Sequence, residues 1–409
     1  MKAVVFHGVG DIRLDDVREP KIKEPTDAIV RLTASAICGT DLHFVRGTMS
    51  GMKPGTILGH EGVGVVEELG KDVRNLRKGD RVVVASTIAC GTCSYCRAGY
   101  QSQCDKNPNG KQAGTAFFGG PLQTGPFDGL QAEFARVPFA HVGLVKLPDG
   151  VSDDQAILLS DIFPTAYFGA EIAEITPGDT VAVFGCGPVG LFAIVSAQML
   201  GADRVLAIDT VPSRLDMARA LGAEVIDYNA EDPIETIQRL TDGIGVDRAI
   251  DAVGVDANRP HAGPAKVSRE DKKEAERMVE QVAPRTNEDG DNWHPGDAPS
   301  QALTWAVEAL AKAGTLSIIG VYPPQMKWFP IGIAMSRNLT VNMGNCPHRR
   351  FIPKLLDLVA SGVVDPTKIL TNREPLVSVI DAYKAFDRRM PGWVKVELAP
   401  ASAPAKKAA

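Results

Sequence analysis

One run, from Val181 to Gly190, constrains the fold of this chain more than any other. It reads VAVFGCGPVG, a short apolar strand that leads into a G-x-G-x-x-G turn, and a helical sequence follows directly. In this context the turn is typical of a site that binds the pyrophosphate of a dinucleotide at the positively polarised start of a helix. From Thr180 to residue 343, six short apolar runs alternate with helical patterns. That alternation predicts an α/β fold with a parallel, doubly wound sheet.

Each glycine of the turn has its own task in such a site. Gly185 permits the tight bend, Gly187 lets a pyrophosphate approach the backbone, and Gly190 lets the helix pack closely on the strand. Pro188 and Val189, between the last two glycines, belong to the same cofactor-binding set. The alternative is a turn that is merely rich in glycine.

An acidic residue stands where this kind of site needs one. Asp209 ends the second strand, where its carboxylate can accept a hydrogen bond from the ribose 2′-hydroxyl. Because Asp209 would repel a 2′-phosphate, we predict NAD as the cofactor in preference to NADP. Arg214 leaves the choice between NAD and NADP partly open, since its guanidinium could pair with a 2′-phosphate or lie against the adenine.

The length and net charge of the chain exclude several classes of protein. With 409 residues, the chain exceeds the usual size of one domain, so two domains are expected. The formal net charge of −6 argues against a nucleic-acid-binding protein. The N-terminal sequence MKAVVF reads as the start of a strand and not as a signal peptide, and no apolar run is long enough for a membrane span. These features predict a cytoplasmic enzyme that binds neither nucleic acid nor membranes.

The first part of the chain, to about Pro148, has a different pattern. Runs such as AIVRLTASAI, GVGVVEELG and DRVVVAS alternate apolar and polar residues and are separated by turns. This pattern predicts an all-β, barrel-like body. After about Asn345 come two helical patterns and a strand-like WVKVEL, which we expect to rejoin the first part.

These patterns divide the chain. We predict a catalytic domain over residues 1–161, an NAD-binding domain over 162–344, and a closing segment over 345–409 that returns to the catalytic domain. The tail from about residue 400 has no periodicity, which predicts disorder. A long polar stretch at 255–300 interrupts the strand–helix alternation, and it is either a functional insertion or a solvated surface loop.

Four cysteines lie close together in the sequence ACGTCSYCRAGYQSQC. At this spacing four thiolates can surround one zinc ion tetrahedrally, at about 2.3 Å each. A site with four protein ligands leaves no position for a substrate, so the loop over residues 90–104 is predicted to bind a structural zinc. The ligands are Cys90, Cys93, Cys96 and Cys104. The alternatives are two disulfides or unbound thiols, which fit a reducing compartment less well.

A second set of possible metal ligands lies in the β-rich part. Cys38 belongs to the sequence CGTD, and His60 and Glu61 belong to GHEG. A thiolate and an imidazole are both good zinc ligands, and a catalytic zinc typically takes three protein ligands and one water or substrate. Local spacing does not supply the third ligand.

Together these motifs resemble the medium-chain, zinc-dependent alcohol dehydrogenases. The sequences CGTD, GHEGVGVVEELG, the four-cysteine loop, KGDRV and GCGPVG occur in the order found in that family and span nearly the whole chain. The resemblance implies a GroES-like catalytic domain beside a Rossmann cofactor domain, with two zinc ions per chain and NAD. It also implies a homo-oligomer, with a tetramer favoured.

The resemblance also names a third ligand. In that family it is commonly a cysteine just before the cofactor domain, and here Asp161 of LSDIFPT occupies the place. This departure, the insertion and the run CGTDLHFVRG resemble the glutathione-independent formaldehyde dehydrogenase branch. The resemblance therefore implies a catalytic zinc bound by Cys38, His60 and Asp161, with Glu61 behind them or as a transient ligand.

The same resemblance implies a reaction. Hydride would pass between NAD and a small alcohol or aldehyde hydrate, with formaldehyde-like substrates preferred. The proton would leave through the Thr40 hydroxyl to the nicotinamide ribose and then to His43. The alternatives are an ordinary turn hydroxyl for Thr40 and an exposed polar residue for His43. If the insertion holds NAD tightly, as in the formaldehyde dehydrogenase branch, the enzyme could also dismutate aldehydes.

Two other functions stay open. One is a polyol or longer-chain alcohol dehydrogenase with exchangeable NAD, in which Phe117, Phe118 and Phe127 either shape the pocket or simply pack in the core. The other is a protein of this fold that has lost catalysis and serves as a nucleotide-binding scaffold.

Overall fold

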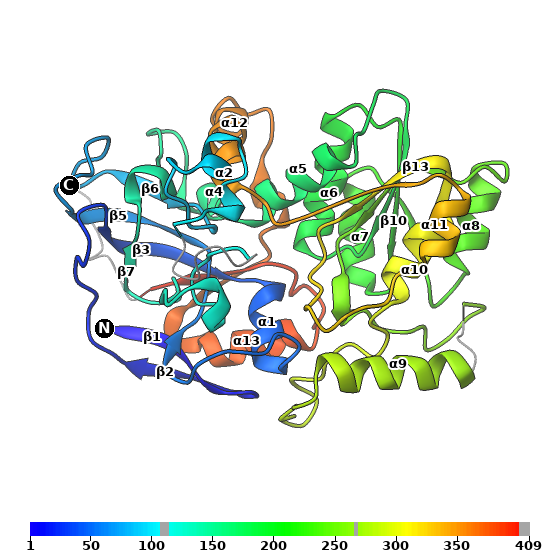
Figure 1. Ribbon diagram of the computed structural model, residues 1–409, viewed down its shortest axis with the longest axis horizontal. Helices are drawn as coiled ribbons and strands as arrows, with labels where there is room; N and C mark the ends of the chain where they lie inside the picture. The colour runs from blue at the N-terminus through cyan, green and yellow to red at the C-terminus, as the bar shows by residue number, and fades with distance from the viewer. Residues whose placement is uncertain (107–113, 266–268, 401–409) are drawn as a thin grey trace.

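Two β-rich bodies lie side by side in the computed structural model, which describes residues 1–106, 114–265 and 269–400 (Figure 1). One body is built on mostly antiparallel sheets and the other on a parallel sheet. We call them the antiparallel body (strands β1 to β8, β15 and β16) and the parallel body (strands β9 to β14).

The antiparallel body contains a three-stranded sheet in the order β2-β1-β4 and a larger seven-stranded sheet. Apolar side chains of the larger sheet, such as Val66 and Val82, are fully buried in the core of this body. Val63 and Val83 are also buried but share a core with side chains of the parallel body, such as Phe192. The last described strand lies antiparallel to β3, with Val396 opposite Ile37, so the closing segment completes a sheet begun near the N-terminus. The strands are β1 (Lys2–Gly8), β2 (Asp11–Asp16), β3 (Ala28–Ile37), β4 (Thr56–Ile57), β5 (Gly62–Leu69), β6 (Arg81–Val84), β7 (Phe134–Val137), β8 (Leu144–Lys146), β15 (Asn372–Pro375) and β16 (Val396–Ala399).

The parallel body confirms the predicted α/β fold. Its six strands pair in the order β11-β10-β9-β12-β13-β14, and every pair is parallel. The direction of strand order reverses between β9 and β12, and ligands of doubly wound sheets bind at the carboxyl ends of the strands at such a point. The strands are β9 (Thr180–Phe184), β10 (Arg204–Asp209), β11 (Glu224–Asp227), β12 (Val246–Asp251), β13 (Leu310–Ile318) and β14 (Thr340–Met343).

Helices cover the parallel sheet and join the two bodies (Figure 1). Apolar side chains at helical spacing hold them together, as where Phe163 of α5 stacks on Phe192 of α6 with ring centroids 4.6 Å apart. The helices are α1 (Gly39–Arg46), α2 (Ser94–Arg97), α3 (Ala140–Gly143), α4 (Asp153–Ile157), α5 (Ile162–Ile172), α6 (Pro188–Met199), α7 (Pro212–Ala220), α8 (Pro233–Leu240), α9 (Arg269–Val282), α10 (Gln301–Ala309), α11 (Ile331–Ser336), α12 (His348–Ala360) and α13 (Val379–Asp387). None of the described helices is long and apolar enough to cross a bilayer.

The predicted insertion at 255–300 has one exposed and one buried part. Helix α9 lies on the surface, whereas the limb that follows it packs on the antiparallel body. Trp293 is 2% exposed there and shares a core cluster with Phe44 and Tyr383. This stretch is therefore more than a solvated loop, because part of it bridges the two bodies. The predicted disordered tail falls on residues 401–409, outside the described part of the chain.

Candidate active site

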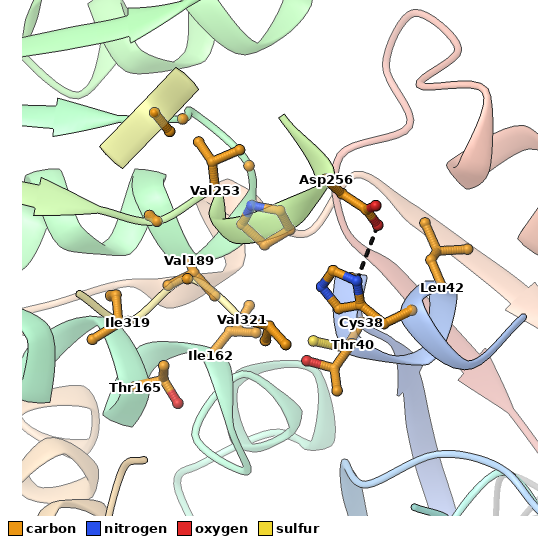
Figure 2. Close-up of a pocket in the computed structure, with 18 of the residues that line it drawn as sticks. Cys38, Thr40, Leu42, Ile162, Thr165, Val189, Val253, Asp256, Ile319 and Val321 are labelled. Atoms are coloured by element: carbon orange, nitrogen blue, oxygen red, sulfur yellow. Dashed lines mark ion pairs between the residues drawn. The ribbon is translucent and has the colours of Figure 1, made fainter. Parts of the chain in front are cut away.

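A cavity of about 320 Å³ lies at the junction of the two bodies (Figure 2). Cys38, Thr40 and His60 line it from the antiparallel body, and Gly187 and Asp209 line it from the parallel body. The predicted metal ligands and the predicted cofactor turn therefore face one shared space.

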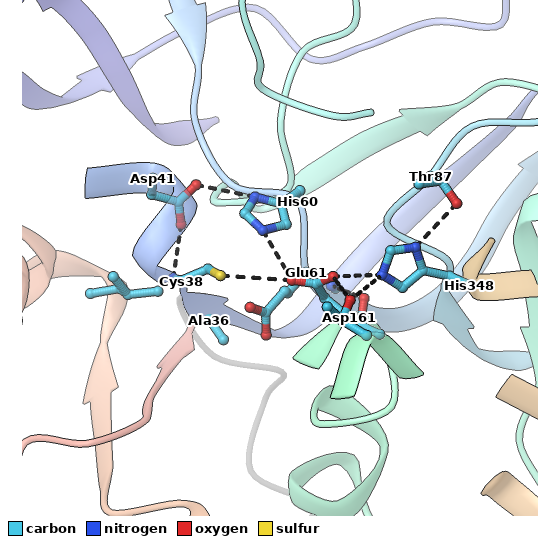
Figure 3. A network of polar contacts seen from close by, with 12 residues as sticks. Ala36, Cys38, Asp41, His60, Glu61, Thr87, Asp161 and His348 are labelled. Atoms are coloured by element: carbon cyan, nitrogen blue, oxygen red, sulfur yellow. Dashed lines mark hydrogen bonds and ion pairs between the residues drawn. The ribbon is translucent and has the colours of Figure 1, made fainter. Parts of the chain in front are cut away.

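Cys38, His60 and Asp161 come together on one side of this cavity (Figure 3). Cys38 directly precedes α1, His60 lies between β4 and β5, and Asp161 directly precedes α5. Cys38 Sγ lies 3.7 Å from Asp161 Oδ2, and His60 Nε2 lies 3.2 Å from the same oxygen. Ligand atoms around a tetrahedral zinc are separated by about 3.3–3.8 Å, so this donor set fits that ion.

His60 is oriented by a buried carboxylate behind it. Its Nδ1 lies 3.2 Å from Asp41 Oδ1, which directs Nε2 towards Asp161. Asp41 Oδ2 is itself fixed, because it accepts hydrogen bonds from the backbone N–H of Cys38 (3.0 Å) and from Gln131 Nε2 (3.3 Å). Burial alone would lower the pKa of His60, but Asp41 and Cys38 raise it well above its ordinary value. A carboxylate partner of this kind is usual for a metal-binding histidine.

Asp161 is held by a histidine that the sequence analysis did not identify. His348, the first residue of α12, places Nε2 2.5 Å from Asp161 Oδ1 and Nδ1 3.1 Å from Thr87 Oγ1. Thr165 Oγ1 lies 3.1 Å from the same Asp161 oxygen. Burial alone would raise the pKa of Asp161, but hydrogen bonds from His348 and His60 hold it well below its ordinary value. Asp161 is therefore a carboxylate whose Oδ2 faces the other two donors.

Glu61 lies within the same group of donors, but its carboxylate is bound elsewhere. Both of its oxygens lie 2.6 Å from Lys395 Nζ, and the same ammonium donates to the carbonyl of Ile37 at 3.1 Å. Both charged side chains are completely buried. Burial alone would lower the pKa of Lys395, but the Glu61 carboxylate raises it. In this arrangement Glu61 stands behind the three other donors and does not point a free oxygen at them.

The four-cysteine loop forms a second donor group. The sulfur atoms of Cys90, Cys93, Cys96 and Cys104 all lie within 4.8 Å of one another. Cys90 Sγ and Cys96 Sγ are 4.0 Å apart, close to the separation of about 3.8 Å in a tetrahedral zinc–thiolate site. Burial would raise the pKa of Cys90, but hydrogen bonds from Thr92 and from the Cys93 N–H lower it to about 6. A thiolate is thus available at neutral pH to bind a metal.

The glycine turn leaves room for a phosphate group. Gly185 has φ +89°, a conformation that favours glycine, and a side chain at Gly190 would lie 1.8 Å from the Gly185 carbonyl oxygen. At Gly187 the nearest atom to an added Cβ is Arg214 Nη1, at 4.0 Å. The space above Gly187 is therefore open towards the cavity and fits a pyrophosphate. Pro188 begins α6, and both Pro188 and Val189 line the cavity.

Asp209 and Arg214 lie beside this turn. Asp209 Oδ2 accepts a hydrogen bond from the Cys186 N–H at 2.7 Å, and Oδ1 accepts from the N–H groups of Thr210 and Val211. Arg214 Nη1 is 4.0 Å from Asp209 Oδ2. Both side chains line the cavity, so this arrangement favours a ribose hydroxyl near a carboxylate whose charge is partly offset by one guanidinium.

Thr40 and His43 both line the cavity from α1, three residues apart and therefore on one face of the helix. His43 is buried and not exposed, in contrast to the alternative that the sequence left open. Of the three aromatic candidates, Phe117 lines the cavity with its ring 6.0 Å from that of His60. Phe118 and Phe127 instead pack in the core of the antiparallel body.

Three important side chains of the site were not predicted from the sequence: Lys395, His348 and Asp256. Each contacts a predicted site residue from an element far away in the sequence. No local motif marks them, although a lysine in a strand-like run and a histidine opening a helix are unusual enough to be noticed.

Two family profiles match the chain. The profile described as the alcohol dehydrogenase GroES-like domain matches residues 24–149, and the zinc-binding dehydrogenase profile matches residues 188–262. The chain is also 36% identical over 405 residues to an uncharacterized zinc-type alcohol dehydrogenase-like protein, AdhB, of Bacillus subtilis (strain 168). That match covers 98% of this chain and 100% of the relative.

Two further comparisons bear on the site. The solved structure of the alcohol dehydrogenase TADH from Thermus sp. ATN1 is 34% identical, with a TM-score of 0.80, and the match covers 98% of this chain and 100% of that one. A glutathione-independent formaldehyde dehydrogenase of Pseudomonas aeruginosa (strain LESB58) is 38% identical over 274 residues, which cover 64% of this chain and 68% of the relative.

Proposed function

Because this chain belongs to the medium-chain zinc-dependent alcohol dehydrogenase family, we propose that it oxidises a small alcohol or aldehyde hydrate and transfers the hydride to NAD. The chain is an oxidoreductase of the zinc-dependent alcohol dehydrogenase type. The observation that carries the proposal is the shared cavity, where Cys38, His60 and Asp161 face the glycine turn that begins at Gly185.

Different residues of the cavity would bind the metal, bind the cofactor and transfer the proton in such a reaction. A zinc ion held by Cys38, His60 and Asp161 would acidify an alcohol hydroxyl, and NAD held at the glycine turn would accept the hydride. The thiolate and the carboxylate together balance the charge of the divalent ion. The Thr40 hydroxyl accepts a hydrogen bond from the substrate hydroxyl, and His43, one helical turn away, holds the released proton.

Formaldehyde-like substrates are our preferred choice. Three observations support it: a carboxylate in place of the usual cysteine ligand, the insertion at 255–300, and similarity to a glutathione-independent formaldehyde dehydrogenase. Apolar side chains of Leu42, Met49 and Phe117 line the cavity and limit the space for a larger substrate. If NAD stays bound between turnovers, one aldehyde hydrate can be oxidised and a second aldehyde reduced on the same cofactor.

Polyols are the second candidate, and the hydroxyl groups of the cavity favour them. Ser86, Thr87 and Thr115 line its wall. Thr115 Oγ1 is buried and has no hydrogen-bond partner among the described residues. A substrate with a second hydroxyl could accept or donate a hydrogen bond there.

The domain division and the assembly are also proposals. We infer one domain from residues 1–161 and 345–409 and a second from 162–344, a division that the pairing of β16 with β3 supports. A cytoplasmic homotetramer with two zinc ions per chain is the form we expect, and the two donor groups of the chain support that metal content.

A substrate panel with matched cysteine variants tests the reaction. Zinc-loaded protein is assayed with NAD against primary alcohols, polyols and formaldehyde, while bound zinc is measured by atomic absorption. Cys38→Ala should abolish NADH formation and lower zinc from two ions per chain to about one. Cys346→Ala changes another buried cysteine of the same cavity, outside the donor group, and should keep both zinc ions. A wild-type protein with one zinc per chain and no activity on the panel would favour the inactive scaffold.

A second experiment tests cofactor retention. The protein is purified without added nucleotide and denatured, and the supernatant is analysed for NAD. About one NAD per active chain supports dismutation on a retained cofactor. An empty supernatant from fully active protein would refute retention and favour a dehydrogenase with exchangeable NAD.

A further inference from the structure

A carboxylate of the parallel body, Asp256, forms an ion pair with His43 of the antiparallel body across the junction. The dashed line that starts at Asp256 in Figure 2 marks this pair. Asp256 ends the one-turn helix η3 (Gly254–Asp256), which follows β12 at the start of the insertion. Its Oδ2 lies 3.0 Å from His43 Nδ1 and 2.8 Å from Arg46 Nη1. His43 and Arg46 lie one turn apart on α1, so one carboxylate oxygen contacts two side chains of the same helix face.

The return limb of the insertion fixes this carboxylate. Asp256 Oδ1 accepts a hydrogen bond from the Gly296 N–H at 3.1 Å. Arg46 is fixed from its other side by Asp387, and Asp387 in turn accepts a hydrogen bond from the Trp293 N–H at 2.8 Å. Burial alone would raise the pKa of Asp256, but His43 and Arg46 hold it well below its ordinary value. Asp256 is therefore ionised, and it can only accept hydrogen bonds.

The surroundings of His43 determine which ring nitrogen carries hydrogen. Thr48 Oγ1 lies 2.8 Å from Nδ1, and its own hydroxyl donates to the His43 carbonyl oxygen at 3.3 Å. Asp256 Oδ2 is the other neighbour of Nδ1. Because both neighbours present lone pairs, the hydrogen of the neutral imidazole belongs on Nδ1, and the lone pair belongs on Nε2. Nε2 has no hydrogen-bond partner among the residues that the structure describes.

We propose that Asp256 is a positioning residue for proton transfer, which fixes His43 as the Nδ1–H tautomer and leaves Nε2 as the base. This inference rests on the proposed function for the origin of the proton. The Thr40 hydroxyl takes up the proton that the substrate hydroxyl loses and releases its own, and the relay ends when an N–H bond forms at His43 Nε2. The Nδ1–H bond stays intact, and the Asp256 carboxylate balances the imidazolium charge without taking up a proton itself.

Few charged groups face this imidazole. Asp256 approaches it from η3, and Arg46 lies beside it on α1. Asp387 of α13 contacts Arg46, and Arg389 donates to the Asp256 carbonyl oxygen at 3.3 Å. Without the Asp256 carboxylate, a protonated His43 would therefore sit near the Arg46 guanidinium with no anion in contact. The insertion therefore has a structural role at the site, since it supplies the carboxylate at its start and the N–H group that fixes it near its end.

Asp256→Asn tests the tautomer directly, without substrate. In ¹⁵N-histidine-labelled protein, long-range ¹H–¹⁵N spectra distinguish the two neutral tautomers, and His43→Gln identifies the signals of this residue. We expect the Nδ1–H pattern in the wild type and a mixture or the Nε2–H pattern in Asp256→Asn. The matched control, Asp387→Asn, removes the other carboxylate on Arg46 and should keep the wild-type pattern. A wild-type Nε2–H pattern, or the same change in both variants, would overturn the proposal.

Kinetics supply the second readout. Asp256→Asn should lower kcat about 10–100-fold with little change in KM, and the acid limb of its pH–rate profile should move to lower pH. In a His43→Gln background the same substitution should cost less than threefold, because Asp256 acts through His43. Full additivity of the two losses, with an unchanged pH profile, would show a merely structural role. If the wild type oxidises no alcohol, the proposed function fails, whereas the spectra still decide the tautomer.

Discussion

A buried acid on the last strand, Glu397 of β16, should make the folded chain less stable as the pH rises towards neutrality. Glu397 is 6% exposed, and its Oε2 has no hydrogen-bond partner in the described part of the chain. Burial raises its pKa from 4.5 to about 7, and the carboxylate of Asp154 adds to this effect while Arg373 opposes it. Over the range between these two values the folded state keeps a proton that the unfolded state has lost.

This proton difference sets the sign and size of the effect. Where the folded state binds one proton more, its stability falls by about 1.4 kcal/mol per pH unit as the pH rises. Over the whole range the loss is at most about 3–4 kcal/mol, and solvent screening should reduce it to about 1–2 kcal/mol. Glu397→Gln cannot ionise and resembles the protonated acid. It should therefore nearly match the wild type at pH 4, below the unfolded pKa, and exceed its stability by about 1–2 kcal/mol at pH 8.

Urea unfolding at a series of pH values, with zinc held constant, measures the difference between the two stability curves. Glu374→Gln on the neighbouring strand β15 makes the same chemical change and serves as the matched control. Only Glu397→Gln should flatten the fall in stability between pH 5 and 8. Parallel curves for Glu397→Gln and the wild type would refute the reasoning, because they would mean that Glu397 ionises at the same pH in both states.

Three further outcomes follow from other contacts. Lys395→Met leaves Glu61 buried without its cation and should lower the free energy of unfolding in urea by about 3–5 kcal/mol. Adding Glu61→Gln should recover most of this stability, and an equal loss in the single and double variants would contradict the reasoning. Cys104→Ser should remove about one zinc per chain and speed proteolysis within residues 90–104 without weakening NAD binding, and unchanged zinc content would count against a structural site. Asp209→Ser should raise kcat/KM for NADP relative to NAD at least about tenfold, as measured by steady-state kinetics; an unchanged ratio would mean that Asp209 does not exclude the 2′-phosphate.

The parallel sheet was predictable because its signals are local. The central strands β9 and β10 are short apolar runs in which all but the first residue is buried, because helices cover both faces of a parallel sheet. The turn beginning at Gly185 lies between the first such run and a helix, which is the only context in which its glycines have this meaning. The bridging role of the insertion was not predictable, because Trp293 is one apolar residue within a polar stretch.

The candidate site also has parts that local sequence predicts and parts that only the tertiary structure reveals. The sequence by itself determined the four-cysteine loop and the glycine turn, because a few neighbouring residues make up each of them. Only the tertiary structure decided which charges face Glu61 and His43. Lys395 is 334 residues from Glu61, and Asp256 is 210 residues from Arg46. Helix and strand periodicities specify which face of an element is buried, but they carry no information about which distant side chain will meet it there.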